Sequence, residues 1–186
     1  MPELISEYVP QFVSDEESAR RVRRARAAWG ATLGVAAWLV ALIVAAPLLR
    51  AGGWEAAAGA VYRAFGMVCH QIGARSFHVE GFQLAVCARC FGLYVGALVG
   101  AAVYPLARPL VRRDMPGRAW LLAAAVPTTV DFALGFFGVW ENTHLSRFLT
   151  ALVLGAVAAF YVVPGIVDLA LSLRGQVLRA KLQREG

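Results

Sequence analysis

The hydrophobic positions of the chain gather into four long blocks, and most of the polar positions fall between them. Each block approaches or exceeds the roughly 20 residues that a helix needs to cross the hydrocarbon core of a bilayer. The pattern predicts an all-α, integral membrane four-helix bundle that forms a single domain over residues 1–186, with a polar N-terminal tail at 1–19. The expected transmembrane helices cover residues 28–49, 90–107, 119–140 and 148–173.

Composition supports a membrane protein and argues against nucleic-acid binding. Hydrophobic residues make up 59% of the sequence and charged residues 16%, whereas a soluble domain has roughly 45–50% and 25%. The net charge of +6 would also suit a nucleic-acid-binding protein. However, the arginines flank the apolar blocks and form no patch interleaved with exposed aromatic residues, so we expect a lipid bilayer as partner and no nucleic acid.

The positions of the cationic residues predict the orientation of the chain. Thirteen of the eighteen lysines and arginines lie before the first block, between the second and third, or after the fourth. The other five are Arg50, Arg63, Arg75, Arg89 and Arg147. Because cytoplasmic loops carry the excess of lysine and arginine, we expect a multi-pass protein of the inner (plasma) membrane with both termini in the cytoplasm and an outward-facing segment at 50–89.

A short amphipathic helix is expected in this outer segment. Its apolar positions are spaced by four and three residues, and they are Trp54, Ala58, Val61, Phe65 and Val68. Such a helix lies flat on the outer surface or in the mouth of the bundle, and it would carry Cys69 toward the protein. The segment from Gln71 to Val86 contains two glycines and is predicted to form a small hairpin or an irregular lid.

All three cysteines of the chain lie between Cys69 and Cys90. Cys87 and Cys90 have the C-x-x-C spacing, which lets two sulfurs share a tetrahedral metal ion or close a small disulfide ring. Cys90 is expected in the first turn of a helix, where unpaired backbone N–H groups and the neighbouring Arg89 favour the thiolate.

The identity of the chemistry at these cysteines stays open at this point. Cys69 can add a third sulfur, and His70 or His78 can add a fourth ligand to complete a zinc site. Because adjacent side chains diverge, His78 is the better partner if Cys69 binds, and His70 is the better ligand if Cys69 does not. The alternatives are a disulfide or redox dithiol, since the outer side of a bacterial membrane is oxidising, and inert buried thiols.

Polar residues in the third and fourth helices extend the candidate site. Asp131 lies about nine residues, roughly 14 Å, from the expected end of the third helix at Trp140. A carboxylate there costs on the order of 2.5–3.5 kcal/mol, so it needs a partner or a function. Arg147 can pair with Asp131 or hold an external anion, and Tyr94 lies one turn below Cys90. We assign candidate catalytic roles to Asp131 and Arg147.

These residues together resemble a known family. The sequence Cys69-His70-Gln71 followed by Arg75, and Cys87-Ala88-Arg89-Cys90 followed by Gly92, Tyr94 and Gly96, are similar to motifs of the domain of unknown function 2085 family of predicted membrane proteins. The similarity extends to Asp131, Asn142, Arg147 and Thr150, and covers about residues 69–155. His78 and His144 do not belong to the pattern.

The resemblance implies a small multi-pass membrane protein with one composite site. The site residues that it implies are Cys69, His70, Arg75, Cys87, Arg89, Cys90, Asp131, Asn142 and Arg147. We therefore take Cys69, His70, Cys87 and Cys90 as the candidate metal ligands. The candidate substrate-binding residues are Arg75, Arg89, Asn142 and Tyr94.

Three functions fit these residues. The first is a zinc site at the extracytoplasmic rim of the bundle, which either joins the outer helix to the second transmembrane helix or stays open to an anionic substrate. The alternative is a membrane thiol-disulfide oxidoreductase that uses Cys87 and Cys90 with a quinone and no metal. A transporter or lipid-handling protein that uses Asp131 and Arg147 is a third interpretation; as an alternating-access carrier, so short a chain would need to form a homo-oligomer.

Overall fold

The computed structural model describes residues 15–112 and 114–185. In these ranges the chain forms five α-helices, one short 3₁₀ helix and one two-stranded sheet. The elements are α1 (Asp15–Ala51), α2 (Glu55–Gly66), η1 (Gly73–Arg75), β1 (His78–Val79), β2 (Phe82–Gln83), α3 (Ala88–Ala107), α4 (Arg118–Phe136) and α5 (His144–Glu185). The predicted all-α class is confirmed.

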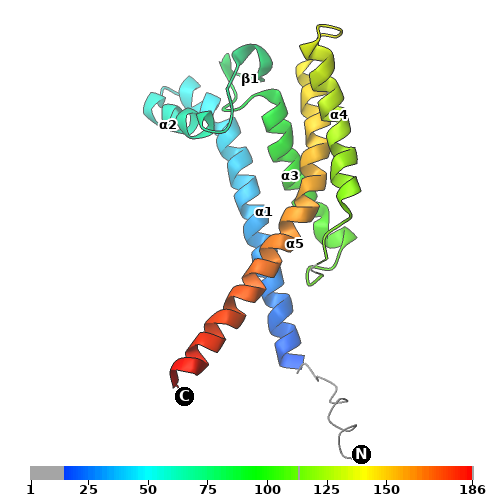
Figure 1. Cartoon of the computed structure of the whole chain (residues 1–186). Helices are drawn as coiled ribbons and strands as arrows, with labels where there is room; N and C mark the ends of the chain where they lie inside the picture. The colour runs from blue at the N-terminus through cyan, green and yellow to red at the C-terminus, as the bar shows by residue number, and fades with distance from the viewer. Residues whose placement is uncertain (1–14, 113, 186) are drawn as a thin grey trace, which may run out of the picture.

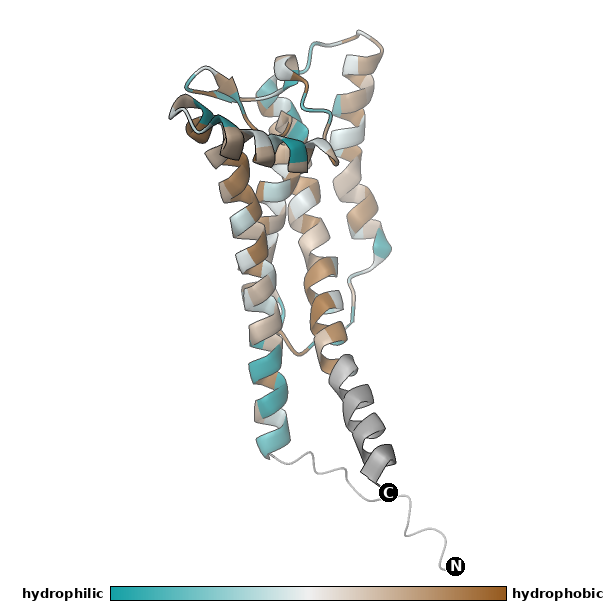
Figure 2. Cartoon of the chain, turned by 90° about the vertical axis from the view of Figure 1, so that its left-hand side faces the viewer, coloured by the Kyte–Doolittle hydropathy of each residue, from teal (hydrophilic) through white to brown (hydrophobic). Residues whose placement is uncertain are grey.

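Four of the helices are long and apolar enough to cross a bilayer. The candidate spans are Glu16–Ala51, Ala88–Ala107, Arg118–Phe136 and His144–Ser172. Apolar residues cover the middle of these helices, whereas polar residues gather at the start of α1 and in the segment around α2 (Figure 2). The chain is therefore a multi-pass membrane protein, and the four spans correspond to the four predicted blocks.

The first and last helices are longer than the sequence predicted. Helix α1 begins at Asp15, so residues 15–19 of the predicted polar tail are helical, while residues 1–14 lie outside the described residues. A helix of 37 residues is roughly 55 Å long, well beyond the roughly 30 Å of a hydrocarbon core. Helix α5 begins at His144, four residues before the predicted start, and continues to Glu185. Both helices therefore extend past the membrane at the end where α1 begins and α5 ends.

Small residues bring α3 and α5 into close contact. A Cβ atom on Gly92, Gly96 or Gly100 of α3 would collide with backbone carbonyl oxygens of α5. In the same way, a Cβ atom on Gly155 of α5 would collide with the carbonyl of Leu93. Membrane helices approach this closely only where small residues face the partner helix. This packing fixes the first turn of α3, which carries two cysteines, against the start of α5.

Helix α4 lies against α5 on the outside of the bundle (Figure 1). It ends at Phe136, so the prediction that it continues to Trp140 was wrong. The chain turns away because Gly138 adopts a left-handed conformation, with φ of 68°, which glycine tolerates and other residues rarely adopt. Asp131 therefore lies about five residues, roughly 8 Å, from the end of its helix. Its carboxylate is closer to the bundle end that holds the cysteines than the sequence suggested.

Helix α2 lies across the end of the bundle, opposite the end where α1 begins and α5 ends (Figure 1). The predicted apolar stripe is correct in its centre, where Ala58 and Phe65 are buried. It is wrong at its two ends. Trp54 caps the helix from outside, Val68 follows it, and both side chains are exposed.

A small hairpin connects α2 to α3, which confirms the first of the two predicted alternatives. Its antiparallel strands pair His78 with Gln83 and Val79 with Phe82. The two turn residues, Glu80 and Gly81, both have positive φ angles, of 52° and 80°, as a tight two-residue hairpin turn requires. The hairpin leads into a buried segment of three residues, Leu84, Ala85 and Val86, just before α3.

An apolar cluster holds the outer segment on the bundle. Leu84, Ala85 and Val86 are almost completely buried, together with Ile43 of α1 and Phe65 of α2. Cys69 belongs to the same cluster and packs beside these side chains. Burial of this apolar surface fixes the end of α2 and the start of α3 relative to each other.

Candidate functional site

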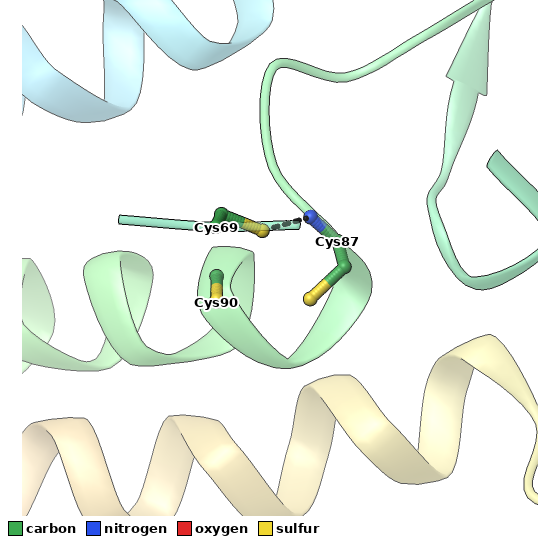
Figure 3. A group of neighbouring side chains, drawn as sticks. All are labelled: Cys69, Cys87 and Cys90. Carbon is green, nitrogen blue, oxygen red and sulfur yellow. Dashed lines mark hydrogen bonds between the residues drawn. The ribbon is translucent and has the colours of Figure 1, made fainter. Parts of the chain in front are cut away.

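The structure brings the three cysteines together although they come from two separated segments. Cys69 follows the end of α2, Cys87 is the N-cap residue of α3, and Cys90 lies in the first turn of α3. Their sulfur atoms all lie within 4.8 Å of one another, and Figure 3 shows them gathered at the first turn of α3. All three are free thiols.

Backbone N–H groups surround the sulfur of Cys69. The N–H of Cys87 donates to Cys69 Sγ at 3.3 Å, as drawn in Figure 3, and the N–H of Gln71 donates to it at 3.5 Å. Cys69 is only 6% exposed. These two hydrogen bonds fix the position of the Cys69 sulfur beside the start of α3.

The thiol of Cys87 has a strongly lowered pKa. A hydrogen bond from the Cys90 side chain lowers the pKa of Cys87 to about 5, from an ordinary value of 9.0. Burial acts in the opposite direction, while hydrogen bonds from the backbone of Cys90 and Arg89 and from the Cys69 side chain add to the lowering. The N-terminus of a helix also favours a thiolate. At neutral pH Cys87 is therefore in the form that binds metal ions and acts as a nucleophile.

Gln71 connects the two segments that carry the cysteines. It adopts a left-handed conformation, with φ of 50°, and its side-chain amide donates to the carbonyls of Tyr62 and Ala85, both at 2.7 Å. The side chain of Gln83 in turn donates to the Gln71 carbonyl at 3.1 Å. These bonds join the end of α2 to the segment before α3, and they hold Cys69 beside Cys87.

Asp131 of α4 pairs with Arg89, the residue next to Cys90. Arg89 Nη2 donates to Asp131 Oδ2 at 2.6 Å, and Ser146 Oγ donates to the other carboxylate oxygen at 2.8 Å. Asn142 donates from its side chain to the backbone carbonyl of Asp131. The sequence had offered Arg147 as the partner of Asp131, but Arg89 occupies that position. The pair ties α4 to the cysteine-bearing turn of α3.

A small cationic cavity of about 160 Å³ lies beside the cysteines. Its polar walls are formed by the three cysteines and by His70, Gln71, Arg75, Arg89 and Arg147. Arg75 and Arg147 form no salt bridge with any described residue. Arg147 Nε is also buried without a hydrogen-bond partner in the described part of the chain. Guanidinium groups of this kind bind carboxylate and phosphate oxygens strongly, so the cavity suits an anion.

The histidines are placed differently from the cysteines. His70 lines the cavity and is exposed, but its nitrogens are outside the group of described ligand atoms that lie within 4.8 Å of one another. His78 is exposed on β1 and is also outside that group. His144 packs against the ring of Phe77. The geometry therefore groups three sulfurs and no nitrogen, and His70 as fourth ligand stays a prediction.

The candidate substrate-binding residues do not all line the same cavity. Tyr94 lines a larger apolar cavity that also reaches Cys90. Asn142 is 8% exposed and faces Asp131, outside the lining of both cavities. Of the candidate substrate-binding residues, Arg75 and Arg89 meet at the small cavity. The roles assigned to Asp131, Asn142 and Tyr94 from the sequence stay predictions.

Ser146 is a site residue that the sequence reasoning missed. The signal was present in the polar residues Ser146 and Thr150, which are four residues apart and so share one side of α5. Ser146 donates to Asp131, and Thr150 Oγ1 donates to the Ser146 carbonyl. Gly135 leaves room for the neighbouring Asn142 side chain, which donates to the Asp131 carbonyl, because a Cβ atom on Gly135 would meet it.

The fold and the sulfur cluster define a multi-pass membrane protein with a cysteine triad beside a cationic cavity at one end of its helical bundle. The chain belongs to the family described as "Predicted membrane protein (DUF2085)", whose model matches residues 69–161. This range begins at the first cysteine and ends within α5, so it includes all the candidate site residues.

Two archaeal relatives match the chain, and both are described as uncharacterised proteins. The protein from Methanocaldococcus jannaschii is 36% identical over 111 residues, which is 60% of this chain and 71% of the relative. The protein from Methanothermobacter thermautotrophicus is 32% identical over 93 residues, which is 49% of this chain and 80% of the relative. No solved structure matches the chain significantly.

Proposed function

We propose that the protein binds one zinc ion through Cys69, Cys87 and Cys90 and keeps the fourth coordination position open. The observation that carries this proposal is the convergence of three sulfurs from separate segments to within 4.8 Å of one another. Zn–S bonds of about 2.3 Å in a tetrahedral site put sulfurs about 3.8 Å apart, a distance that small side-chain rotations can provide here.

The surroundings of the sulfurs support a metal site. The acidic Cys87 thiol supplies a thiolate without a large cost of deprotonation, which is the state that zinc binds. The N–H groups that donate to Cys69 act as the outer hydrogen bonds that orient a metal ligand. Three protein ligands with one open position are typical of zinc sites that bind a water or a substrate, whereas structural sites are closed by four.

The open position would face the small cationic cavity. Arg75 and Arg147, which lack salt bridges in the described chain, would attract an anion to it, and Arg89 is held at its wall by Asp131. We therefore propose that the zinc ion binds an anionic ligand at its open coordination position. A zinc ion supplies Lewis-acid chemistry and lowers the pKa of bound water, and the residues of the chain position and charge-balance the ligand.

The zinc content of the purified full chain tests this proposal. We expect about one zinc ion per chain after purification without added metal, by elemental analysis, and thiols that react with a maleimide only after chelation. Cys69→Ser, Cys87→Ser and Cys90→Ser should each lose most of the zinc, because two thiolates rarely hold zinc alone. As a matched control, Ser76→Ala should keep it, since Ser76 is buried in the same loop outside the cluster. Equal zinc in the wild type and the cysteine variants would contradict the site.

A thiol-disulfide oxidoreductase is the second candidate function. The low pKa of Cys87 supports it, because a thiolate with an acidic conjugate acid is both a nucleophile and a good leaving group. The chain contains only three cysteines, so electrons from the Cys87–Cys90 pair would have to pass to a cysteine pair of a partner protein or directly to a quinone. Protein purified without reductant that carries no zinc and a reversibly reducible Cys87–Cys90 disulfide would favour this function.

We propose that the protein lies in the plasma membrane with both termini in the cytoplasm and the cysteines on the outer side. Support comes from the thirteen cationic residues that lie, in the sequence, before the first span, between the second and third, or after the fourth, and from the position of α2 opposite the end where α1 begins and α5 ends. An impermeant thiol reagent, applied to intact cells after chelation, should label the cysteines. Labelling only in cells opened from the cytoplasmic side would contradict this orientation.

A further inference from the structure

A second, larger cavity adjoins the cysteine site. Its volume is about 670 Å³, and α1, α3 and α5 form its walls. Apolar side chains line nearly all of it, among them Val35 and Leu39 of α1, Ala97 of α3, and Ala158 and Val162 of α5. All of these residues belong to candidate membrane spans. The cavity therefore lies at the depth of the hydrocarbon core, where it suits an apolar chain rather than a polar solute.

The larger cavity runs along α3 from Cys90 to Ala101. This distance corresponds to roughly 16 Å of helix, about half of the roughly 30 Å hydrocarbon core. One leaflet of a bilayer has this depth. The size and direction of the cavity therefore match one acyl or prenyl chain of a lipid in the leaflet next to the cysteines.

The two cavities share part of their walls. Val68, Cys69 and Cys90 line both the apolar cavity and the cationic one. The cysteine cluster therefore lies at the boundary between a membrane-depth apolar space and a polar, positively charged space. A molecule that occupies both spaces must have an anionic end and an apolar chain, with the junction beside the sulfurs.

The charge and the volume of the cationic cavity both suit a phosphate group as the anionic end of the bound molecule. Asp131 neutralises Arg89, so Arg75 and Arg147 leave two unpaired positive charges around the cationic cavity. A phosphomonoester carries a charge of about −1.5 to −2 at neutral pH, and its oxygens can pair with both guanidinium groups. The cavity volume of about 160 Å³ has room for a phosphate group.

We infer that the anion at this site is the terminal phosphate of a membrane lipid whose hydrocarbon chain lies in the groove between α1, α3 and α5. The inference rests on the proposed function for the open zinc position, which a phosphate oxygen would face. Arg75 and Arg147 bind the phosphate, and Ala36, Ala97 and Ala158 keep the groove wide enough for the chain. The substrate class is therefore a lipid phosphomonoester, such as a phosphatidic acid or a polyprenyl phosphate.

Binding of phosphatidic acid to the zinc-loaded full chain tests the inference. The chain is reconstituted in phosphatidylcholine nanodiscs, and lipid bound per chain is measured by native mass spectrometry after titration with phosphatidic acid, with phosphatidylcholine or with inorganic phosphate. We expect one phosphatidic acid per chain, with an affinity at least about tenfold higher than that of phosphatidylcholine, which is about 1.4 kcal/mol. Inorganic phosphate should compete only weakly with phosphatidic acid, because it lacks a hydrocarbon chain.

Two matched pairs of variants test separately the binding of the lipid phosphate and the binding of its hydrocarbon chain. Arg147→Gln should weaken phosphatidic acid binding by about tenfold or more, whereas Arg63→Gln, an exposed arginine at the same end outside both cavities, should not. Ala36→Phe should fill the groove and weaken lipid binding, while leaving competition by inorganic phosphate unchanged. Ala37→Phe, on the exposed side of the same helix, is its control. Zinc content is measured in every variant as a check on the folded site.

The outcomes distinguish the lipid from the metal site. Zinc at one per chain with equal binding of phosphatidic acid and phosphatidylcholine would overturn the lipid inference and leave the zinc proposal intact. Equal effects of Ala36→Phe and Ala37→Phe would overturn the assignment of the groove. Phosphatidic acid bound as tightly by a zinc-free Cys90→Ala chain would overturn the placement of the phosphate at the metal position. Tight binding of inorganic phosphate alone would mean that a soluble anion is the ligand.

Discussion

The acidity of Cys87 arises from its position at the start of α3, beside Cys90. A thiolate there accepts hydrogen bonds from the side chain of Cys90 and from backbone N–H groups of the first turn. Because the pKa of the folded thiol is lowered, the reactive thiolate persists as the pH falls and disappears only near pH 5. Above that value a free Cys87 is ready to bind metal or to react.

We predict that Cys87 of the zinc-free protein is alkylated at pH 6 at close to its maximal rate. A thiol with the ordinary value of 9.0 would be almost fully protonated at that pH. Peptide-resolved mass spectrometry after brief iodoacetamide treatment from pH 4 to 9 gives the midpoint of labelling. Cys90→Ala removes the main hydrogen bond and should move this midpoint toward 9.0. A wild-type midpoint above pH 8 would show that Cys87 is an ordinary thiol.

The ion pair between Asp131 and Arg89 joins α4 to the wall of the cationic cavity. Asp131→Asn leaves a partly buried guanidinium without its counter-charge, which should lower the free energy of unfolding by about 1–3 kcal/mol. Unfolding in detergent, followed by circular dichroism, measures the change. Replacing both partners, with Arg89→Met and Asp131→Leu, should recover most of the loss.

The loop carboxylate Asp114 provides the control for Asp131. It pairs with Arg112 and Arg108 but is far more exposed, so Asp114→Asn should change stability by less than about 0.5 kcal/mol. If the two substitutions have equal effects, Asp131 contributes no more than a surface ion pair and does not fix Arg89.

At the scale of the helices, the position of the cysteine-bearing turn depends on the contact between α3 and α5. Gly96→Ala would put a Cβ atom against the carbonyl oxygen of Leu152, and the helices would have to separate. We expect a loss of about 1–3 kcal/mol in the free energy of unfolding. Gly34→Ala on α1 meets nothing within 4 Å, so it should be neutral or slightly stabilising. A neutral Gly96→Ala would show that these two helices are not in close contact.

The helices were the part of the fold that the sequence predicted best, and their ends were the part it predicted worst. The length of an apolar block reports the depth of the bilayer, so all four spans were found. The end of α4 depends on the backbone of Gly138, and nothing in the pattern of apolar residues up to Trp140 marks it. The start of α1 at Asp15 depends on polar residues outside the membrane.

At the scale of the whole molecule, the candidate site was predictable in its residues but not in its pairings. The clustered motifs pointed to the cysteines and to the arginines near them, because soft ligands and charges are rare in so apolar a chain. Which arginine meets Asp131 depends on how α3, α4 and α5 pack, so Arg89 could not be told from Arg147. The apolar groove beside Cys90 is made by three helices, and no single segment of sequence encodes it.

The molecule as a whole places a cluster of sulfurs between a membrane-depth groove and a cationic cavity. The proposed zinc ion would connect the sulfurs to a ligand through its open position, so its coordination is the property to measure. X-ray absorption spectroscopy at the zinc edge of the purified full chain tests it most directly. The account predicts three sulfurs at about 2.3 Å and one lighter atom at about 2.0 Å. A zinc ion without sulfur neighbours, or a chain that binds no zinc when its thiols are reduced, would contradict it.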